Sequence, residues 1–196
     1  MKKNLSFLGW ALLFTLPFLF VACGDDDEDV DPTPTPMSIV EIASGDAQFS
    51  TLVAALQQAD LVSTLEGTGP FTVFAPTNAA FTAAGIDLAT ISDAALTEVL
   101  LYHVLGGAKV TSGDLADGQT YASTASTYGP DATQLSVLIE KGTNGVVLNG
   151  TTNVSTADVD ATNGVIHIVD GVLMPLDVVG HASANSNFTS LVGALV

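Results

Sequence analysis

The stretch GPFTVFAPTNAAF (residues 69–81) changes from a strand pattern to a helix pattern within a few residues. Its first half alternates along a strand with apolar groups on both faces, Phe71, Val73 and Ala75 on one face and Thr72 and Phe74 on the other. Pro76 lacks the N–H that would continue the hydrogen-bond ladder, so we expect the strand to end there. Thr77 or Asn78 then caps a short helix. The stretch therefore predicts a buried strand that leads directly into a helix.

An amphipathic helix is predicted before this stretch. Its apolar face recurs at the i, i+3, i+4, i+7 spacing and consists of Phe49, Leu52, Val53 and Leu56. We expect the helix to span residues 46–59, with Ser44 or Asp46 as its N-cap.

A second helix is predicted after it, beginning at Ser92 or Asp93. We expect it to end at Gly106-Gly107, because glycine adopts the left-handed backbone of a helix terminus without strain. Its apolar face consists of Leu96, Val99, Leu100 and His103. Because His103 lies within that face, a histidine hydrogen-bonded inside the core is the expected interpretation.

Beyond Gly107 the sequence is dominated by short strand-forming runs and by turn residues. The predicted strands are residues 108–111, 120–123, 134–140, 146–148, 154–159 and 165–169. The predicted turns between them are Asn144-Gly145, Asn149-Gly150 and Asn163-Gly164. Since the helices precede the strands instead of alternating with them, the predicted fold class is α+β.

A second motif, NGVIHIVDGVLMP (residues 163–175), occupies the last predicted strand and its continuation. Together with residues 69–81, and with Asn149-Gly150 and Asp158-Val159 between them, it resembles the signature boxes of fasciclin-like domains in order and spacing. The resemblance covers nearly all of residues 38–175. It implies one domain over residues 38–176, with N-terminal helices packed on a β-sheet wedge or sandwich.

The resemblance also nominates one pair of candidate contact residues. Tyr102-His103 matches a family motif linked, in animal matrix relatives, to receptor binding at the cell surface. We therefore name Tyr102 and His103 as candidate partner-contact residues, while their helix-face spacing favours burial. His167 shares a strand face with Val165 and Val169, so a core or turn-bonding histidine is expected there too.

The first residues of the chain have the pattern of an export signal. Residues 1–22 begin with Lys2 and Lys3 and continue with an apolar run. The run is shorter than the roughly 20 apolar residues that a spanning helix needs, and acidic residues follow it where a spanning helix usually has basic ones. Ala22-Cys23 resembles the lipoprotein box, in which the cysteine is lipidated. The alternative is a free Cys23 inside an ordinary signal peptide. Residues 23–37, an acidic block followed by a Pro-Thr spacer, are expected to form a solvated tether.

Composition narrows the range of partners. The 196 residues contain 21 Asp and Glu against 4 Lys and no Arg, which gives a formal net charge of −17 at pH 7. Binding a phosphate backbone requires clustered basic side chains, so we expect no nucleic acid partner. An acidic surface favours solubility and cation-rich surroundings.

The end of the sequence repeats its beginning. Residues 185–195 match residues 46–56 at an offset of 139, and Val178-Val179 likewise corresponds to Ile39-Val40. We expect residues 177–196 to be the start of a second, truncated fasciclin-like repeat, so that the sequence is part of a tandem protein. A stray terminal helix is the alternative. In either case we expect the tail to be poorly packed, because it repeats the apolar stripe without a sheet to cover it.

No catalytic, metal-binding or phosphate-binding motif is found, so we predict no enzyme activity, no metal and no cofactor. The leading hypothesis is a lipid-anchored adhesion module, held in the outer membrane through Cys23 and displayed on the surface, that binds a protein or glycan. Two alternatives remain: capture of a small ligand in a cleft, at the surface or on the periplasmic face, and a structural spacer in a tandem array. The sequence makes no prediction of the oligomeric state.

Overall fold

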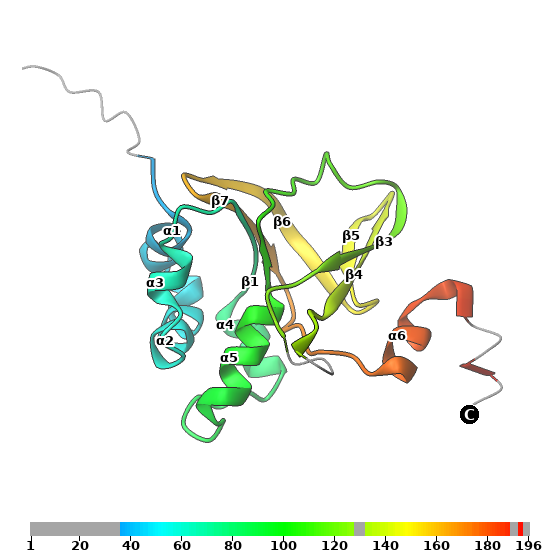
Figure 1. The fold of residues 1–196 in the computed structure, drawn as a ribbon, viewed down its shortest axis with the longest axis horizontal. Coiled ribbons are helices and arrows are strands. Elements are labelled where there is room, and N and C mark those ends of the chain that lie inside the picture. The colour runs from blue at the N-terminus through cyan, green and yellow to red at the C-terminus, as the bar shows by residue number, and fades with distance from the viewer. Residues whose placement is uncertain (1–35, 128–131, 189–191, 194–196) are drawn as a thin grey trace, which may run out of the picture. The chain divides into compact units, whose positions relative to one another are not determined.

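The computed structural model describes residues 36–127, 132–188 and 192–193 (Figure 1). The helices and 3-10 turns are α1 (Ile39–Gly45), η1 (Ala47–Phe49), α2 (Ser50–Gln58), α3 (Val62–Leu65), α4 (Asn78–Ala83), α5 (Asp93–Tyr102), α6 (Val178–Ala184) and η3 (Ser186–Phe188). The strands are β1 (Phe71–Pro76), β2 (Val104–Gly106), β3 (Gly118–Ser123), β4 (Ser136–Gly142), β5 (Gly145–Leu148), β6 (Thr152–Ala161) and β7 (Gly164–Val169). The predicted α+β class is confirmed.

The seven strands form one sheet in the order β2-β1-β7-β6-β5-β4-β3. Only the β1–β7 pair is parallel; every other neighbouring pair is antiparallel. Just beyond β3, Ala125 N–H donates a 2.7 Å hydrogen bond to Val104 O on β2, at the opposite edge of the sheet. The sheet is therefore nearly closed on itself.

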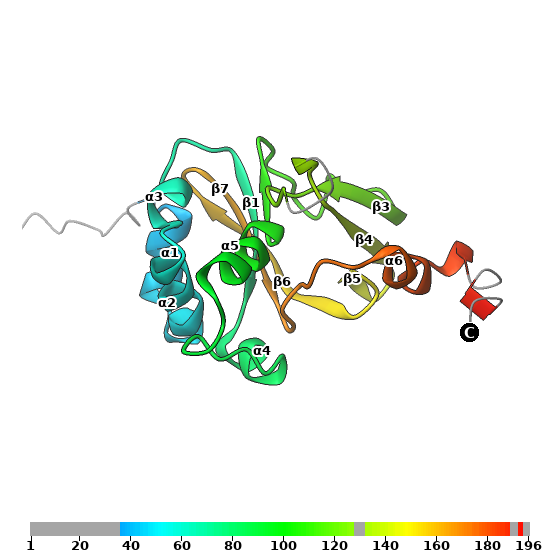
Figure 2. The same cartoon turned by 60° about the horizontal axis from the view of Figure 1, so that its bottom comes forward.

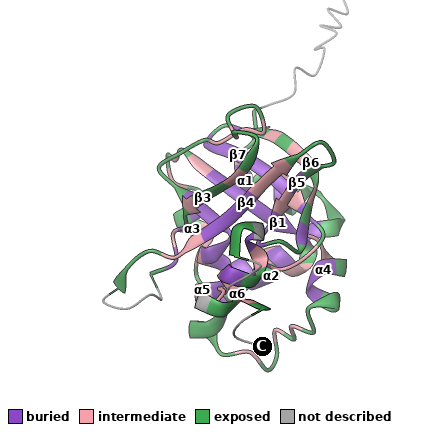
Figure 3. Ribbon diagram, turned by 90° about the vertical axis from the view of Figure 1, so that its right-hand side faces the viewer, coloured by how far each residue is buried: buried purple, intermediate pink, exposed green. Residues whose placement is uncertain are grey.

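Strand β1 is buried on both faces, as its alternating pattern predicts. Val73 and Ala75 belong to the core between the sheet and the helices, whereas Phe74 belongs to a second core enclosed by the sheet. Thr77 caps α4 by accepting a hydrogen bond from Ala80 N–H. Figure 3 shows the buried residues that run along the central strands. The stretch 69–81 thus separates the two cores of the domain.

The predicted helix over residues 46–59 is present as η1 followed by α2, so its first turn is a 3-10 turn. A separate helix, α1, precedes it, and the chain bends by 105° before the unit of η1 and α2 that ends at Gln58. Ser38 and Glu41 form a reciprocal capping box that begins α1. Asp46 caps η1, as one of the two expected caps. The apolar periodicity does not predict α1, because this helix is only two turns long.

The second predicted helix begins as expected, with Ser92 as its N-cap, but it ends early. The helix stops at Tyr102, and the next residues, predicted to be helical up to Gly106-Gly107, form β2. Val104 pairs there with Val73 of β1. The predicted strand over residues 108–111 is also wrong, because the backbone of this segment bonds to the Thr72 hydroxyl group instead of a neighbouring strand.

No single helix among the described residues is long and apolar enough to cross a membrane, although the bent pair of α1 with η1–α2 passes the same test of length and composition. The predicted signal peptide, the lipidated Cys23 and the tether up to residue 35 lie outside the described residues.

Residues 178–188 of the tail are better packed than expected. Figures 1 and 2 show α6 beside β4 and β5, on the opposite side of the sheet from α1, α2 and α3. Ala182 and Asn185 are buried, whereas Val179 and Phe188 are about half exposed. The expectation of a poorly packed tail is therefore wrong for one of its faces and right for the other.

Candidate partner-binding site

Tyr102 and His103 lie where α5 ends, as its last residue and its C-cap. Their exposed fractions are 0% and 2%, so neither side chain reaches the surface of the described structure. The expectation of a buried, hydrogen-bonded His103 is confirmed. A partner contact through either residue stays a prediction.

His103 joins α5 to the segment that follows β7. Its Nδ1 lies 2.7 Å from Val99 O, and since a carbonyl oxygen only accepts, Nδ1 carries the proton. Its Nε2 accepts a 2.8 Å hydrogen bond from Leu173 N–H. Burial lowers the pKa of His103 to about 4, although the bond to Val99 works in the other direction. The imidazole is therefore neutral near pH 7, and it joins the backbone of Val99 to the backbone of Leu173.

Tyr102 makes a second bridge beside it. Its hydroxyl group donates a 2.9 Å hydrogen bond to Ser136 O, in β4, and accepts a 3.2 Å bond from Asn149 Nδ2. Asn149 Nδ2 also approaches Met174 O at 3.4 Å. Burial raises the pKa of Tyr102, which therefore stays protonated as a donor. The pair thus fixes α5 against β4 and against residues 173–174.

An open hollow lies along α5 and reaches Pro175. Its volume is ≈ 750 Å³. It is lined by Ser92, Ala94, Ala95, Thr97, Glu98, Val99 and Pro175. Most of these side chains are small, and among the described lining residues only Glu98 is charged. Its carboxylate accepts a 2.8 Å hydrogen bond from Ser126 Oγ. The hollow therefore presents a shallow surface of small side chains with one carboxylate.

His103 bonds to Val99, which lines the hollow, and to Leu173, which lies two residues before the lining residue Pro175. Val99, whose carbonyl group bonds to His103, belongs to one wall, and Pro175 belongs to the other. Pro175 follows Leu173 and Met174, the two residues whose backbone groups are held by His103 and Asn149. The motif nominated by sequence therefore supports a surface instead of forming it.

The interior of the domain offers far less space. One cavity in the core enclosed by the sheet, next to Phe74 and His167, has a volume of ≈ 10 Å³. Another, next to Phe49 in the core under the helices, has ≈ 20 Å³. A single water needs roughly 10–15 Å³ of such space, whereas ligand pockets of drug-sized molecules measure roughly 300–1,000 Å³. These cavities are too small for a small-molecule ligand.

Ser112, Asp158 and His167 lie close together at one end of the sheet, but not in the arrangement of a nucleophile and its base. Ser112 Oγ donates to the Asp158 carboxylate, which lowers the pKa of Asp158. His167 Nδ1 accepts from Asp158 N–H, and Nε2 donates to Val110 O. Both ring nitrogens are thus used by backbone groups, and His167 is the core histidine that the strand pattern predicts.

Metal ligands are not gathered anywhere in the part of the chain that the structure describes. Within it, no group of three or more His, Cys, Asp or Glu side chains is placed to hold an ion.

Sequence reasoning missed the residues that line the hollow. A signal for them exists, because Ala94, Ala95 and Glu98 occupy the outer face of α5, opposite its apolar stripe. The contribution of Pro175 comes from the fold alone, since it lies 76 positions after Val99 in the sequence and lines the same hollow.

Comparison with known proteins gives a consistent family match. The family model described as "Fasciclin domain" matches residues 47–175. Protein sll1483 of Synechocystis sp. is 43% identical over 146 residues, which cover 71% of this chain and 74% of that protein. Transforming growth factor-beta-induced protein ig-h3 of Sus scrofa is 37% identical over 143 residues, which cover 70% of this chain but only 19% of that protein.

A solved structure shows the same fold. It is described as a FAS1 domain pair from the insect cell adhesion molecule Fasciclin I, and it aligns with a TM-score of 0.56 at 21% identity. The alignment covers 70% of this chain and 51% of that one. The arrangement of helices on a nearly closed sheet is therefore shared with a domain that occurs in an adhesion molecule.

Proposed function

Because the chain belongs to the fasciclin domain family, we propose that it is a lipid-anchored adhesion module that binds a protein or glycan partner at the cell surface. In this proposal the partner contacts the hollow over α5, and Tyr102 and His103 are positioning residues beneath it. The domain acts by binding and catalyses no reaction.

The proposal depends on the difference in volume between the cavities inside the domain and the hollow at its surface. Among the described residues, the cavities within the two cores measure ≈ 10 and ≈ 20 Å³ and are too small for a captured small molecule, whereas the hollow of ≈ 750 Å³ is open. A macromolecule approaches a domain from outside and needs a surface of this kind. The contrast argues against capture of a ligand inside the domain. The volume of the hollow falls within the range of small-ligand pockets, but its openness and its mostly small side chains favour a large partner.

The membrane attachment is proposed from sequence. Residues 1–22 have the pattern of a signal peptide, and Cys23 stands where lipidation would make it the mature N-terminus. The acidic and Pro-Thr tether that follows would hold the domain away from the membrane. We therefore propose attachment to the outer membrane, with the domain displayed outward; a periplasmic orientation is the alternative.

Protease treatment of intact cells tests the display. Lysed cells are the control, and mass spectrometry identifies the released piece. A fragment that begins within residues 25–36 and is released from intact cells supports outward display. Cleavage only after lysis contradicts it and favours the periplasmic orientation.

Substitutions in the hollow test the contact surface. Ala95→Arg introduces a long charged side chain into the hollow, and Ala54→Arg makes the same change on the exposed surface of α2 as a matched control. We expect Ala95→Arg to abolish adhesion of coated beads to cells or matrix, whereas Ala54→Arg retains it. Equal adhesion by the two variants, with equal melting temperatures, would place the contact elsewhere.

A further inference from the structure

The C-terminal segment repeats the first helices of the domain in conformation as well as in sequence. Helix α6 (Val178–Ala184) and η3 (Ser186–Phe188) have the same bounds as α1 (Ile39–Gly45) and η1 (Ala47–Phe49), 139 positions later in each case. No residue is inserted or lost between the helix and the 3-10 turn. Residues 178–188 therefore repeat the helix and the 3-10 turn with which the first domain begins.

The capping interactions are repeated as well. Asp177 Oδ1 accepts from the N–H of Gly180, three residues later, as Ser38 Oγ accepts from Glu41 in the first copy. Asn185 Oδ1 accepts from Asn187 N–H, as Asp46 Oδ1 accepts from Gln48. Caps of this kind set where a helix begins, so both copies are specified locally.

The apolar side chains of the two copies differ in burial. Val40 and Phe49 are 7% and 3% exposed, whereas their counterparts Val179 and Phe188 are 50% and 46% exposed. Phe49 belongs to the core formed with residues of β1, β7 and α5. The second copy therefore exposes side chains whose counterparts in the first copy are buried in a core. Among the described residues, no strands cover Val179 and Phe188 as β1 and β7 cover Val40 and Phe49.

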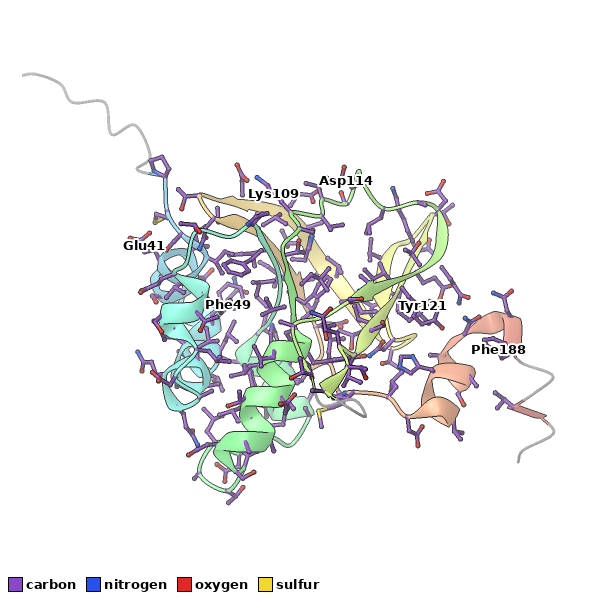
Figure 4. All side chains as sticks on the ribbon, viewed as in Figure 1. Glu41, Phe49, Lys109, Asp114, Tyr121 and Phe188 are labelled. Atoms are coloured by element: carbon purple, nitrogen blue, oxygen red, sulfur yellow. The ribbon has the colours of Figure 1, made fainter. Side chains whose placement is uncertain are left out.

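The opposite face of the segment is docked on the first domain. Asn185 Nδ2 donates a 3.0 Å hydrogen bond to Tyr121 Oη, and Asn187 Nδ2 donates a 3.2 Å bond to Gln119 Oε1. The rings of Tyr121 and His181 lie 6.0 Å apart between centroids. Figure 4 shows Tyr121 next to α6, and Phe188 on the side of the segment away from the sheet.

The connection to the first domain is short. Met174 O is still bound by Asn149, and Asp177 already caps α6. Only Pro175 and Leu176 lie between them, and proline restricts the backbone further. Both the linker and the docked face thus limit how the segment can turn.

We propose that residues 178–188 begin a second fasciclin domain, and that Gln119 and Tyr121 of β3 form the docking surface that fixes its orientation. The strands of that second domain cover Val179 and Phe188, as β1 and β7 cover Val40 and Phe49. The partner of this surface is thus another copy of the same domain in the same chain. The inference rests on the repeat and its contacts, independently of adhesion.

Hydrogen exchange of the full chain tests the docking. Tyr121→Ala removes the acceptor for Asn185, and we expect the amides of residues 178–188 to exchange roughly two- to ten-fold faster, the effect of losing one hydrogen bond. Thr120→Ala, on the opposite face of β3, is the matched control and leaves the exchange unchanged. Unprotected amides in the parent, or equal rates in both variants, would overturn the docking.

An extended chain tests the second domain. Val196 corresponds to Gln57, so a copy of residues 58–175 is joined after Val196. In this chain Phe188→Asp is expected to abolish the unfolding transition of the added copy. In the unextended chain the same change leaves the melting temperature within about 2 °C, because Phe188 is exposed there.

Phe49→Asp in the first copy is the positive control, since it destabilises the first domain in both chains. An added copy that stays unfolded, or one that tolerates Phe188→Asp, contradicts the proposal. Sedimentation velocity of the unextended chain supplies the remaining test. Self-association that Phe188→Asp abolishes would assign the exposed face to a second molecule and overturn the proposal.

Discussion

The side-chain amide of Asn163 donates a 2.7 Å hydrogen bond to the carbonyl oxygen of Leu65, 98 residues earlier in the chain. The same nitrogen reaches Gly67 O at 3.0 Å, and Asn163 Oδ1 accepts a 3.1 Å bond from Ile39 N–H. One side chain, 8% exposed, therefore holds the start of α1 and the end of α3 against the beginning of β7.

Asn163→Ala is expected to lower the free energy of unfolding by roughly 2–4 kcal/mol, because it leaves buried backbone groups of α1 and α3 without partners. Urea denaturation measures the change. Asn144→Ala, in the exposed turn between β4 and β5, is the control and should cost less than about 0.5 kcal/mol. A similar small loss for both variants would show that water replaces the Asn163 side chain.

Gly164→Ala is expected to disrupt the parallel pairing of β1 with β7. A Cβ atom at this position would lie 2.0 Å from Phe71 O, a backbone atom that cannot move without separating the two strands. We expect a loss of roughly 1–3 kcal/mol or more, measured by thermal unfolding. Gly142→Ala, where a Cβ meets no atom within 4 Å, is the matched control and leaves the melting temperature nearly unchanged.

Tyr102→Phe retains the aromatic ring but removes the hydroxyl group that joins β4 to Asn149. We expect destabilisation by about 1–2 kcal/mol, because Ser136 O and Asn149 Nδ2 both lose a buried partner. If Tyr102 also positions the hollow, the variant should weaken adhesion while the domain is still folded. Wild-type adhesion together with reduced stability would limit Tyr102 to a structural role.

The elements that could be predicted from sequence are those whose signal is local. The strand and helix of residues 69–81 and the start of α5 at Ser92 follow from alternation, Pro76 and side-chain caps. A local signal for α1 was also present, because Ser38 and Glu41 stand at the spacing of a capping box. Strand β2 had none, since Val104 and Leu105 continue the apolar pattern of the preceding helix.

The buried roles of Asn149 and Asn163 could not be predicted, because their partners are distant in sequence, whereas a helix or strand face predicts the burial of His103 and His167. Asn149 and Asn163 were assigned to turns, where they do lie, yet their exposed fractions are 4% and 8% and their side chains each bind three backbone or hydroxyl groups. The hollow over α5 depends on Pro175 in the same way. Sequence identified Asn149 and Asn163 as turn residues, and the tertiary fold determines what they bind.

The neutral state of His103 predicts how stability depends on pH. The pKa of His103 is about 4 in the folded protein, against 6.5 for an ordinary histidine, so between these values the unfolded chain binds a proton that the folded chain does not. Stability is therefore complete above pH 6.5 and decreases as the pH falls toward 4, by about 3 kcal/mol in total. Urea denaturation between pH 5 and 6.5 measures this slope above the main range of carboxylate titration.

His103→Gln removes the titrating group and should flatten the dependence on pH in this interval. It should lower stability near pH 7, because the bridge from Val99 to Leu173 is lost. His181→Gln, on the terminal helix α6, is the control and should retain the slope that arises from His103. If His103→Gln retains the full slope, another group causes it. If the parent shows no slope, the folded protein protonates His103 as readily as the unfolded chain does, and the bridge is not maintained in solution.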